Sequence, residues 1–169
     1  IVRRLVGSEM CIRDSFWDLE RNYYPWLRDE PLIEGRHGNY QAIRESYLPD
    51  HFRADWETFN VVGSVHVEAD WDPSDEVAET RWLHEIHERT GLPSAVVAHA
   101  HLSDEDVEGV LAAHARYPLV RGIRDKPAAA ARPQEVVLGA PGSMGDPAWR
   151  RGYALLQDHG FSFDLQTPY

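Results

Sequence analysis

Between residues 61 and 166, short apolar segments alternate with longer amphipathic ones, and this alternation constrains the fold more than any other feature of the 169-residue sequence. The segments 61–69, 94–102, 120–124 and 161–166 are typical of strands. The segments 75–90, 104–117 and 146–159 are typical of helices. Strands that alternate with helices favour a parallel sheet with right-handed crossovers, so we predict an α/β fold.

Glycine and short polar residues mark the ends of the predicted helices. Gly91 and Gly160 directly follow helical segments, where a glycine commonly closes a helix in a left-handed conformation. Ser103 precedes the segment 104–117, and Asp106 stands three residues later, where a capping box has its acid. We therefore expect Ser103 to be the N-cap of that helix.

Each predicted strand divides into an apolar and a polar set, because successive side chains point to opposite faces. The polar sets become more polar toward the C-terminal end of each strand, which is where (β/α) barrels hold their active sites. A merely solvated face is the alternative. The polar sets are Ser64, His66, Glu68 and Asp70; His99, His101 and Ser103; and Ser162, Asp164 and Gln166.

Glu68 is the candidate catalytic carboxylate of the first of these strands. Among histidines, a carboxylate can bind a divalent cation or accept a proton from water. An ion pair with a neighbouring Arg or Lys is an equally good interpretation. His66 points the same way but lies deeper, so we expect it to be a buried, neutral, hydrogen-bonded ring.

Two further histidine pairs have spacings that metal sites use. His99 and His101 lie on one face of a strand, so both rings could bind one metal, although lining of the site is the favoured interpretation. His84 and His87 lie on a predicted helix, and we expect them on its exterior.

Arg124 ends the short strand VRGIR with its side chain toward the polar face. Its guanidinium could hold a carboxylate or carbonyl oxygen of a substrate. An internal salt bridge to Asp164 or Glu68 is the alternative. Arg121 has the opposite parity and is expected to pack outward.

The composition excludes several classes of partner. The net charge is −11, from 28 acidic and 17 basic residues, and no basic cluster offsets it, so we expect no nucleic-acid partner. No apolar run approaches the roughly 20 residues of a membrane span. Cys11 is the one cysteine, so any metal must use His, Asp or Glu. We expect a cytoplasmic protein.

Several dispersed motifs resemble one family. They are FWDLERNYYPWL, VHVEADWDP, RGIRDKP, PGSMGDPAWRRGYALL and FDLQTP. Together, from Phe16 to Tyr169, they resemble the amidohydrolase-related TIM-barrel hydrolases (amidohydrolase family 2), which include the sugar-acid lactonases. A whole barrel needs about 250 residues, so the resemblance implies a truncated N-terminal half of a (β/α)8 TIM barrel.

The resemblance also implies a function. It suggests hydrolysis of a small carbonyl substrate, in the first place a sugar-acid lactone, by water or metal-bound hydroxide, with zinc or a similar divalent metal in the complete parent protein. The family's remaining His and late Asp lie on strands beyond Gln166. Two alternatives are a decarboxylase of a related branch and a non-catalytic binding fragment. An isolated half barrel is expected to be inactive and to self-associate through open sheet edges or form a homo-oligomer.

The first 15 residues do not fit the resemblance. They look like translated sequencing-adapter sequence, so we expect an artefactual segment 1–15 and a partial barrel domain 16–169. In the family, a His-x-His pair precedes Phe16, but here Arg13 and Ser15 occupy those positions. The metal ligands that this pair would supply are therefore missing, and Glu68 is left as a possible ligand.

Other site residues follow from the resemblance alone. It implies that Gln166 donates to an oxygen of the ligand, that Asp164 orients the ligand in a catalytic role, and that Arg124 binds substrate. Structural hydrogen bonds are the alternative for Asp164 and Gln166. The resemblance also suggests an aromatic wall suited to sugar rings. Its members are Trp17, Tyr23, Tyr24 and Trp26.

Overall fold

The computed structural model describes residues 10–31, 39–130 and 132–166, without the side chains of residues 10–14. Five parallel strands form one sheet in the order β1-β2-β3-β4-β5. They are β1 (Met10–Asp14), β2 (Val61–Val67), β3 (Ala95–His99), β4 (Val120–Asp125) and β5 (Ser162–Leu165). The prediction of a parallel α/β fold is confirmed.

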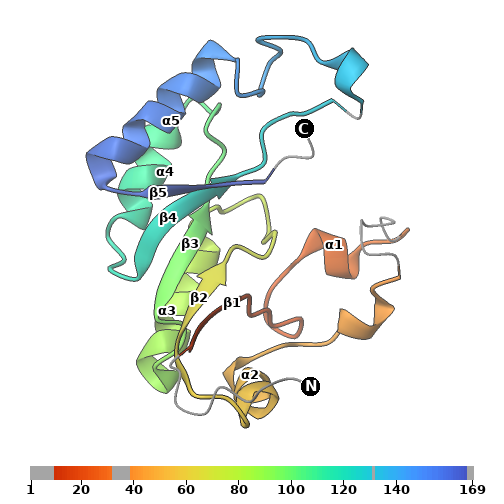
Figure 1. Cartoon of the computed structure of the whole chain (residues 1–169), viewed down its shortest axis with the longest axis vertical. Coiled ribbons are helices and arrows are strands. Elements are labelled where there is room, and N and C mark those ends of the chain that lie inside the picture. Colours follow the sequence, from red (N-terminus) through yellow and green to blue (C-terminus); the bar gives the residue numbers. More distant parts are fainter. Residues whose placement is uncertain (1–9, 32–38, 131, 167–169) are drawn as a thin grey trace, which may run out of the picture.

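Across the described ranges, five α-helices accompany the sheet. They are α1 (Pro25–Arg28), α2 (Pro49–Trp56), α3 (Ala78–Thr90), α4 (Val107–His114) and α5 (Pro147–His159). Short 3-10 helices span Gln41–Ile43 and Pro133–Glu135. In Figure 1 the sheet curls, with α3, α4 and α5 along its outer side and α1 and α2 on the opposite side. This is the arrangement of one part of a (β/α) barrel.

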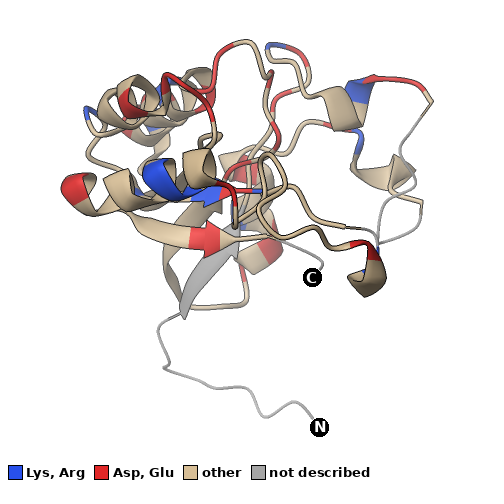
Figure 2. Cartoon of the chain, turned by 90° about the horizontal axis from the view of Figure 1, so that it is seen from above, with Lys and Arg blue, Asp and Glu red and all other residues tan. Residues whose placement is uncertain are grey.

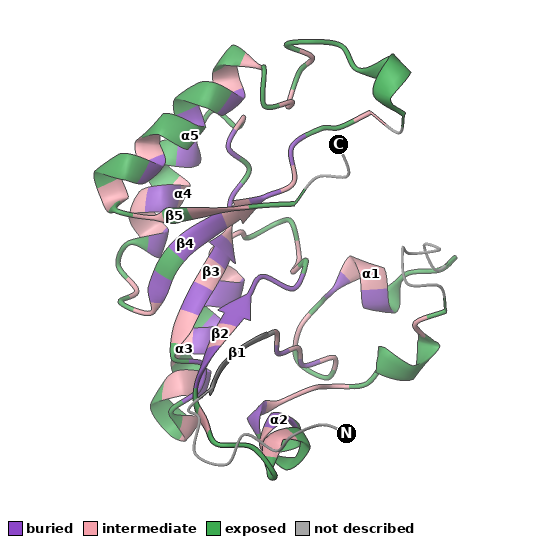
Figure 3. Ribbon diagram, in the orientation of Figure 1, coloured by how far each residue is buried: buried purple, intermediate pink, exposed green. Residues whose placement is uncertain are grey.

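The main core lies between the sheet and the outer helices. Figure 3 shows burial concentrated in β2, β3, β4 and the sheet-facing sides of the helices, whereas α5 is exposed on its outer side. Apolar side chains of α3, α4 and α5 supply the helical half of this core. Its most buried members include Leu83, Val96, Leu111, Ile123, Trp149 and Leu156. A second, smaller cluster joins Tyr24 and Leu27 to Ala69 at the end of β2.

The predicted helix ends are confirmed at the C-terminal side. Gly91 and Gly160 cap α3 and α5 in the left-handed conformation, with φ of 76° and 66°. The N-terminal boundaries of α3 and α4 differ from the prediction. Asp75 does not begin α3, because its carboxylate accepts from the amide of Val77 at 3.1 Å and forms a separate turn first.

The predicted capping role of Ser103 is wrong. Two successive turns, closed by hydrogen bonds from Asp104 N to His101 O and from Val107 N to Asp104 O, occupy the segment before α4. The helix begins at Val107, with Asp106 as an N-cap that makes no side-chain capping bond. Local turns therefore replace the helical turn that the pattern predicted.

The sheet begins within the segment that we expected to be foreign. Residues of β1 pair with β2 from Met10↔Val61 to Asp14↔His66, so a first strand is present next to β2. Nothing in the structure tests the adapter origin of residues 1–15 or the domain boundary after residue 15, and both stay predictions.

Acidic residues are spread over many elements, as Figure 2 shows, in keeping with the net charge of −11. In the described parts of the chain, no helix is long and apolar enough to cross a membrane.

Candidate active site

The sheet register gathers the predicted polar residues at the C-terminal ends of its strands. His99 of β3 pairs with Arg124 of β4, and Arg124 pairs with Asp164 of β5. Glu68 directly follows β2, and its amide donates to Val97 O of β3 at 2.9 Å. Four neighbouring strands thus contribute one polar side chain each to the same edge.

Glu68 is held in a tight, buried turn at this edge. Asp70 has a φ of 52°, a left-handed conformation that aspartate tolerates better than most residues. This turn lets the amide of Asp70 donate to Glu68 Oε2 at 2.9 Å. Glu68 is only 4% exposed.

Two cations face the carboxylate of Glu68. Arg124 Nη1 lies 3.5 Å and Lys126 Nζ 3.2 Å from Glu68 Oε1, and Lys126 also pairs with Asp70. Burial raises the pKa of Glu68 to about 7, with Asp70 adding to the rise and Lys126 opposing it. Glu68 is therefore poised to change its charge near neutral pH.

Arg124 bridges two carboxylates from different strands. Besides Glu68, its Nη2 lies 3.3 Å from Asp164 Oδ1. The internal salt bridge that the sequence left open is therefore present, and binding of substrate stays a prediction. Arg121 is exposed and donates to the carbonyl of Val120 at 3.1 Å, so its predicted outward packing is confirmed.

His66 is a buried structural ring, as predicted. Its Nδ1 accepts from Phe16 N at 3.0 Å, so the proton belongs on Nε2, which lies 3.1 Å from Glu79 Oε1. The same oxygen of Glu79 accepts from Ala69 N at 3.0 Å. This network ties the end of β2 to α3 beside Glu68.

A pocket of about 360 Å³ opens next to these charges. Its walls combine two tryptophans, Trp26 and Trp71, with two histidines, His99 at the end of β3 and His101 just beyond it. Lys126 and Asp70, which contact Glu68, also line it. The remaining lining residues are Pro25, Asp72, Pro73, Glu76 and Glu79.

His99 and His101 meet edge to face in this pocket, with ring centroids 4.5 Å apart. Burial and the neighbouring His101 lower the pKa of His99 to about 4, so its ring is neutral at pH 7. His114 of α4 fixes the strand end through an Nε2 bond to His99 O at 2.9 Å. Both histidines line this pocket, and their contact with substrate stays a prediction.

The remaining residues singled out in the sequence do not line this pocket. Trp17 packs on Trp26 and Tyr47 and donates to Glu45 O at 2.6 Å, behind the pocket wall that Trp26 forms. Gln166 is exposed just beyond β5, so its contact with substrate stays a prediction. Side chains of the other aromatic and helical candidates are engaged locally. Tyr23 donates to Asp29, Tyr24 is in the second core cluster, His84 faces Glu88 and His87 contacts Pro93 O.

The described residues do not form a metal site. No group of three or more His, Cys, Asp or Glu among them could hold a metal ion. Glu68, the possible ligand, already faces two cations, which disfavour a further positive ion. Ser15, at one position of the family's His pair, instead donates to Val67 O at 2.5 Å. The side chain of Arg13 lies outside the described residues.

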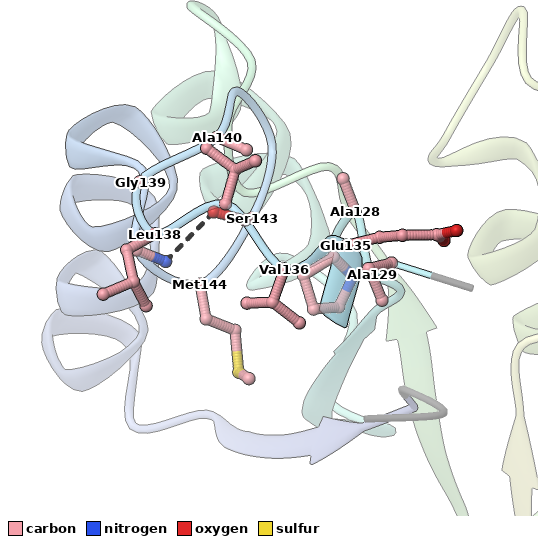
Figure 4. A pocket seen from close by; sticks show the side chains of 13 residues that line it. Ala128, Ala129, Glu135, Val136, Leu138, Gly139, Ala140, Ser143 and Met144 are labelled. Carbon is pink, nitrogen blue, oxygen red and sulfur yellow. Dashed lines mark hydrogen bonds between the residues drawn. The ribbon is translucent and has the colours of Figure 1, made fainter. Parts of the chain in front are cut away.

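A second pocket, of about 380 Å³, lies in the loop between β4 and α5. Its lining is mostly apolar and includes the exposed Val136, Leu138 and Met144. Figure 4 shows the carboxylate of Glu135 pointing away from Leu138 and Met144. The lining thus offers little chemistry for a reaction.

Sequence reasoning missed several residues that line the pocket and one, Asp125, that contacts its lining through His101. Asp125 and Lys126 follow Arg124 directly, and a run of charges after an apolar strand was a signal that both belong to the same edge. Trp71 and Glu79 carried no such signal, because their places depend on how the segment after β2 turns back over the sheet.

Comparisons with known proteins agree with this fold. No family model matches the sequence. The uncharacterized protein y4mH of Sinorhizobium fredii is 37% identical over 165 residues, which are 96% of this chain and 55% of that protein. The chain thus spans about half the length of the curated relative that it matches.

Solved structures also match nearly all of this chain with about half of their own length. A zinc-bound amidohydrolase of Burkholderia multivorans has a TM-score of 0.64 and 22% identity, covering 94% of this chain and 48% of that chain. A probable 2-pyrone-4,6-dicarboxylic acid hydrolase of Acinetobacter baumannii, with citric acid bound, has a TM-score of 0.54 and 11% identity, covering 92% and 48%. The chain therefore has the fold of about half of each of these structures.

Proposed function

We propose that the complete protein is a hydrolase of the amidohydrolase superfamily that acts on a small carbonyl compound, and that this compound is a sugar-acid lactone. The observation that carries the proposal is Glu68, a buried carboxylate with a pKa raised to about 7, at the C-terminal edge of a barrel-like sheet and beside a tryptophan-lined pocket. A group with a pKa near the working pH is suited to proton transfer.

The similarity in fold supports this assignment. The solved structures of the same fold are described as amidohydrolases and as a hydrolase of a pyrone dicarboxylic acid. Their chains are about twice as long as the matching part of this chain, so we assign the activity to the complete protein and expect the 169-residue chain alone to be inactive.

The reaction can be assigned to side chains and water. In its carboxylate form, Glu68 accepts a proton from the attacking water, and Arg124 and Lys126 hold the carbonyl oxygen as it gains negative charge. Asp164 keeps Arg124 in place through their ion pair. Trp26 and Trp71 offer the aromatic surface that a sugar ring favours.

A decarboxylase is the less favoured function. That interpretation requires a metal and an additional pair of arginines facing a substrate carboxylate. Among the described residues, Arg124 is the one arginine with a charged contact to Glu68, and the residues form no metal site. The cytoplasmic location expected from the sequence stays a prediction.

The test is a panel of sugar-acid lactones assayed with the complete protein by release of acid. We expect turnover of at least one lactone and a loss of kcat/KM of about 100-fold or more in Glu68→Gln. Glu88→Gln is the matched control, because Glu88 is exposed on α3, and it should leave the rate unchanged. Absence of turnover across the panel, or full activity in Glu68→Gln, would contradict the proposal.

A further inference from the structure

Asp125, the last residue of β4, is a buried carboxylate that the reaction described above does not use. It is 3% exposed, and its Oδ2 accepts from Trp149 Nε1 at 2.5 Å. Its Oδ1 accepts from Lys126 N at 2.8 Å. Burial opposes its ionisation, but the hydrogen bonds from His101, Trp149 and Lys126 N outweigh burial and lower the pKa of Asp125. Asp125 is therefore a fixed negative charge.

This charge faces His101, which lines the pocket. His101 Nδ1 lies 3.8 Å from Asp125 Oδ1, and the backbone amide of His101 donates to Glu76 Oε2 at 3.1 Å. Asp125 thus faces the Nδ1 side of the ring at ion-pair distance, and Nε2 is the ring nitrogen left for contact with a ligand. A carboxylate behind a histidine in this way orients the ring and stabilises its charged form.

Most of the charged groups around His101 raise its pKa. The contact with Asp125 raises the pKa of His101, Glu76 and Asp104 add to the rise, and burial opposes it. The neighbouring His99 is affected in the opposite direction, because burial, His101 and the ammonium of Lys126 all lower its pKa. His101 is therefore the more basic member of the histidine pair, and His99 the less basic one.

We propose that His101, oriented by Asp125, is the general acid of this site and protonates the leaving oxygen of the lactone. The assignment rests on the proposed function. Water adds to the carbonyl carbon and gives one proton to Glu68, so a new C–O bond forms. The ring C–O bond then breaks, and the ring oxygen takes the proton from Nε2 of His101. The product is the open hydroxy acid, and solvent returns the proton from Glu68 to His101.

The proposal predicts which limb of the pH–rate profile belongs to His101. Activity needs Glu68 as carboxylate and His101 as imidazolium, so kcat/KM should rise with pH through the pKa of Glu68 and fall through that of His101. In Asp125→Asn the imidazolium loses its stabilising charge, so its pKa falls and the basic limb moves to lower pH. The acidic limb should move little by comparison.

The experiment combines this profile with an NMR titration of the His101 ring in the complete protein. We expect His101→Gln to lower kcat/KM by about 100-fold and to remove the basic limb. Asp125→Asn should lower the NMR pKa of His101 and the basic limb together. His84→Gln, at a half-buried histidine of α3 that does not line the pocket, is the matched control and should change neither. Thermal melting checks that each variant folds.

Two outcomes distinguish a failure of the role proposed for His101 and Asp125 from a failure of the proposed hydrolase function. An active protein whose basic limb is the same in the wild type and Asp125→Asn would overturn the role of the pair and leave the hydrolase function standing. A wild-type protein that hydrolyses no lactone, whatever the pKa of His101, would overturn both.

Discussion

At the scale of single residues, Glu68 shows why the reaction and the stability of the protein are linked. Its carboxyl is buried beside two cations, yet burial outweighs them and raises its pKa to about 7, above the ordinary value of 4.5. Between these two pH values the folded protein binds more protons than the unfolded chain. The free energy of unfolding must therefore fall as pH rises through this window.

Glu68→Gln should remove this pH dependence, because glutamine keeps the shape and does not ionise. Relative to the variant, the wild type should lose about 3 kcal/mol of unfolding free energy between pH 4.5 and pH 7.5, as its folded carboxyl is forced to ionise. Urea denaturation of the complete protein at several pH values measures this difference. An unchanged difference between the two proteins across the window would show that Glu68 titrates normally.

The sequence was more informative about which residues lie at the edge than about which ion pairs they form with one another. Strand parity and strand ends were sufficient to place Glu68, Arg124 and Asp164 at one edge of the sheet, because parallel strands end at one edge. The pairing of Arg124 with both carboxylates could not be chosen in advance, since it depends on the register between β2, β4 and β5. Asp125 was missed because a charge after a strand does not reveal which ring it will face.

At the scale of elements, α5 packs unusually close to the segment after β3. A Cβ atom added at Gly152 would lie 2.0 Å from Leu102 O and 2.8 Å from Leu102 C. Both are backbone atoms, which a side-chain rotation cannot relieve. The close packing of α5 therefore depends on the absence of a side chain at Gly152. Its C-terminal end at Gly160 was predicted from the sequence, whereas the N-cap role of Asp146 was not.

Gly152→Ala should lower the free energy of unfolding by about 2 kcal/mol or more, because α5 must move away from Leu102. Gly109→Ala is the matched control on α4, where an added Cβ meets nothing within 4 Å, and it should raise stability by about 0.5–1 kcal/mol. Urea denaturation of the complete protein measures both. If both substitutions changed the free energy of unfolding by the same amount, the close approach of α5 to Leu102 would be contradicted.

At the scale of the whole molecule, the sheet has two strands that pair on one side alone in the described part of the chain, β1 and β5. Leu165 of β5 and Val62 of β2 are 46% and 58% exposed. An unpaired strand edge beside apolar side chains favours association with another chain. The alternation of elements predicted the parallel sheet, and the family resemblance implied the half barrel. The turns that precede α3 and α4 depend on local hydrogen bonds that no periodicity reveals.

The 169-residue chain alone should therefore self-associate. We expect light scattering coupled to gel filtration to give masses above the 19.3 kDa of one chain. A monodisperse monomer that melts cooperatively would contradict this prediction and would mean that the open edges are protected.

The central claim is that water, activated at the edge that holds Glu68, opens the substrate. The most direct measurement is the reaction of the complete protein with the best lactone of the panel in water labelled with oxygen-18, followed by mass spectrometry of the product. The account predicts one labelled oxygen in the new carboxylate of the hydroxy acid, no released carbon dioxide, and loss of this product in Glu68→Gln. Release of carbon dioxide, or the same labelled product from Glu68→Gln at the wild-type rate, would contradict it.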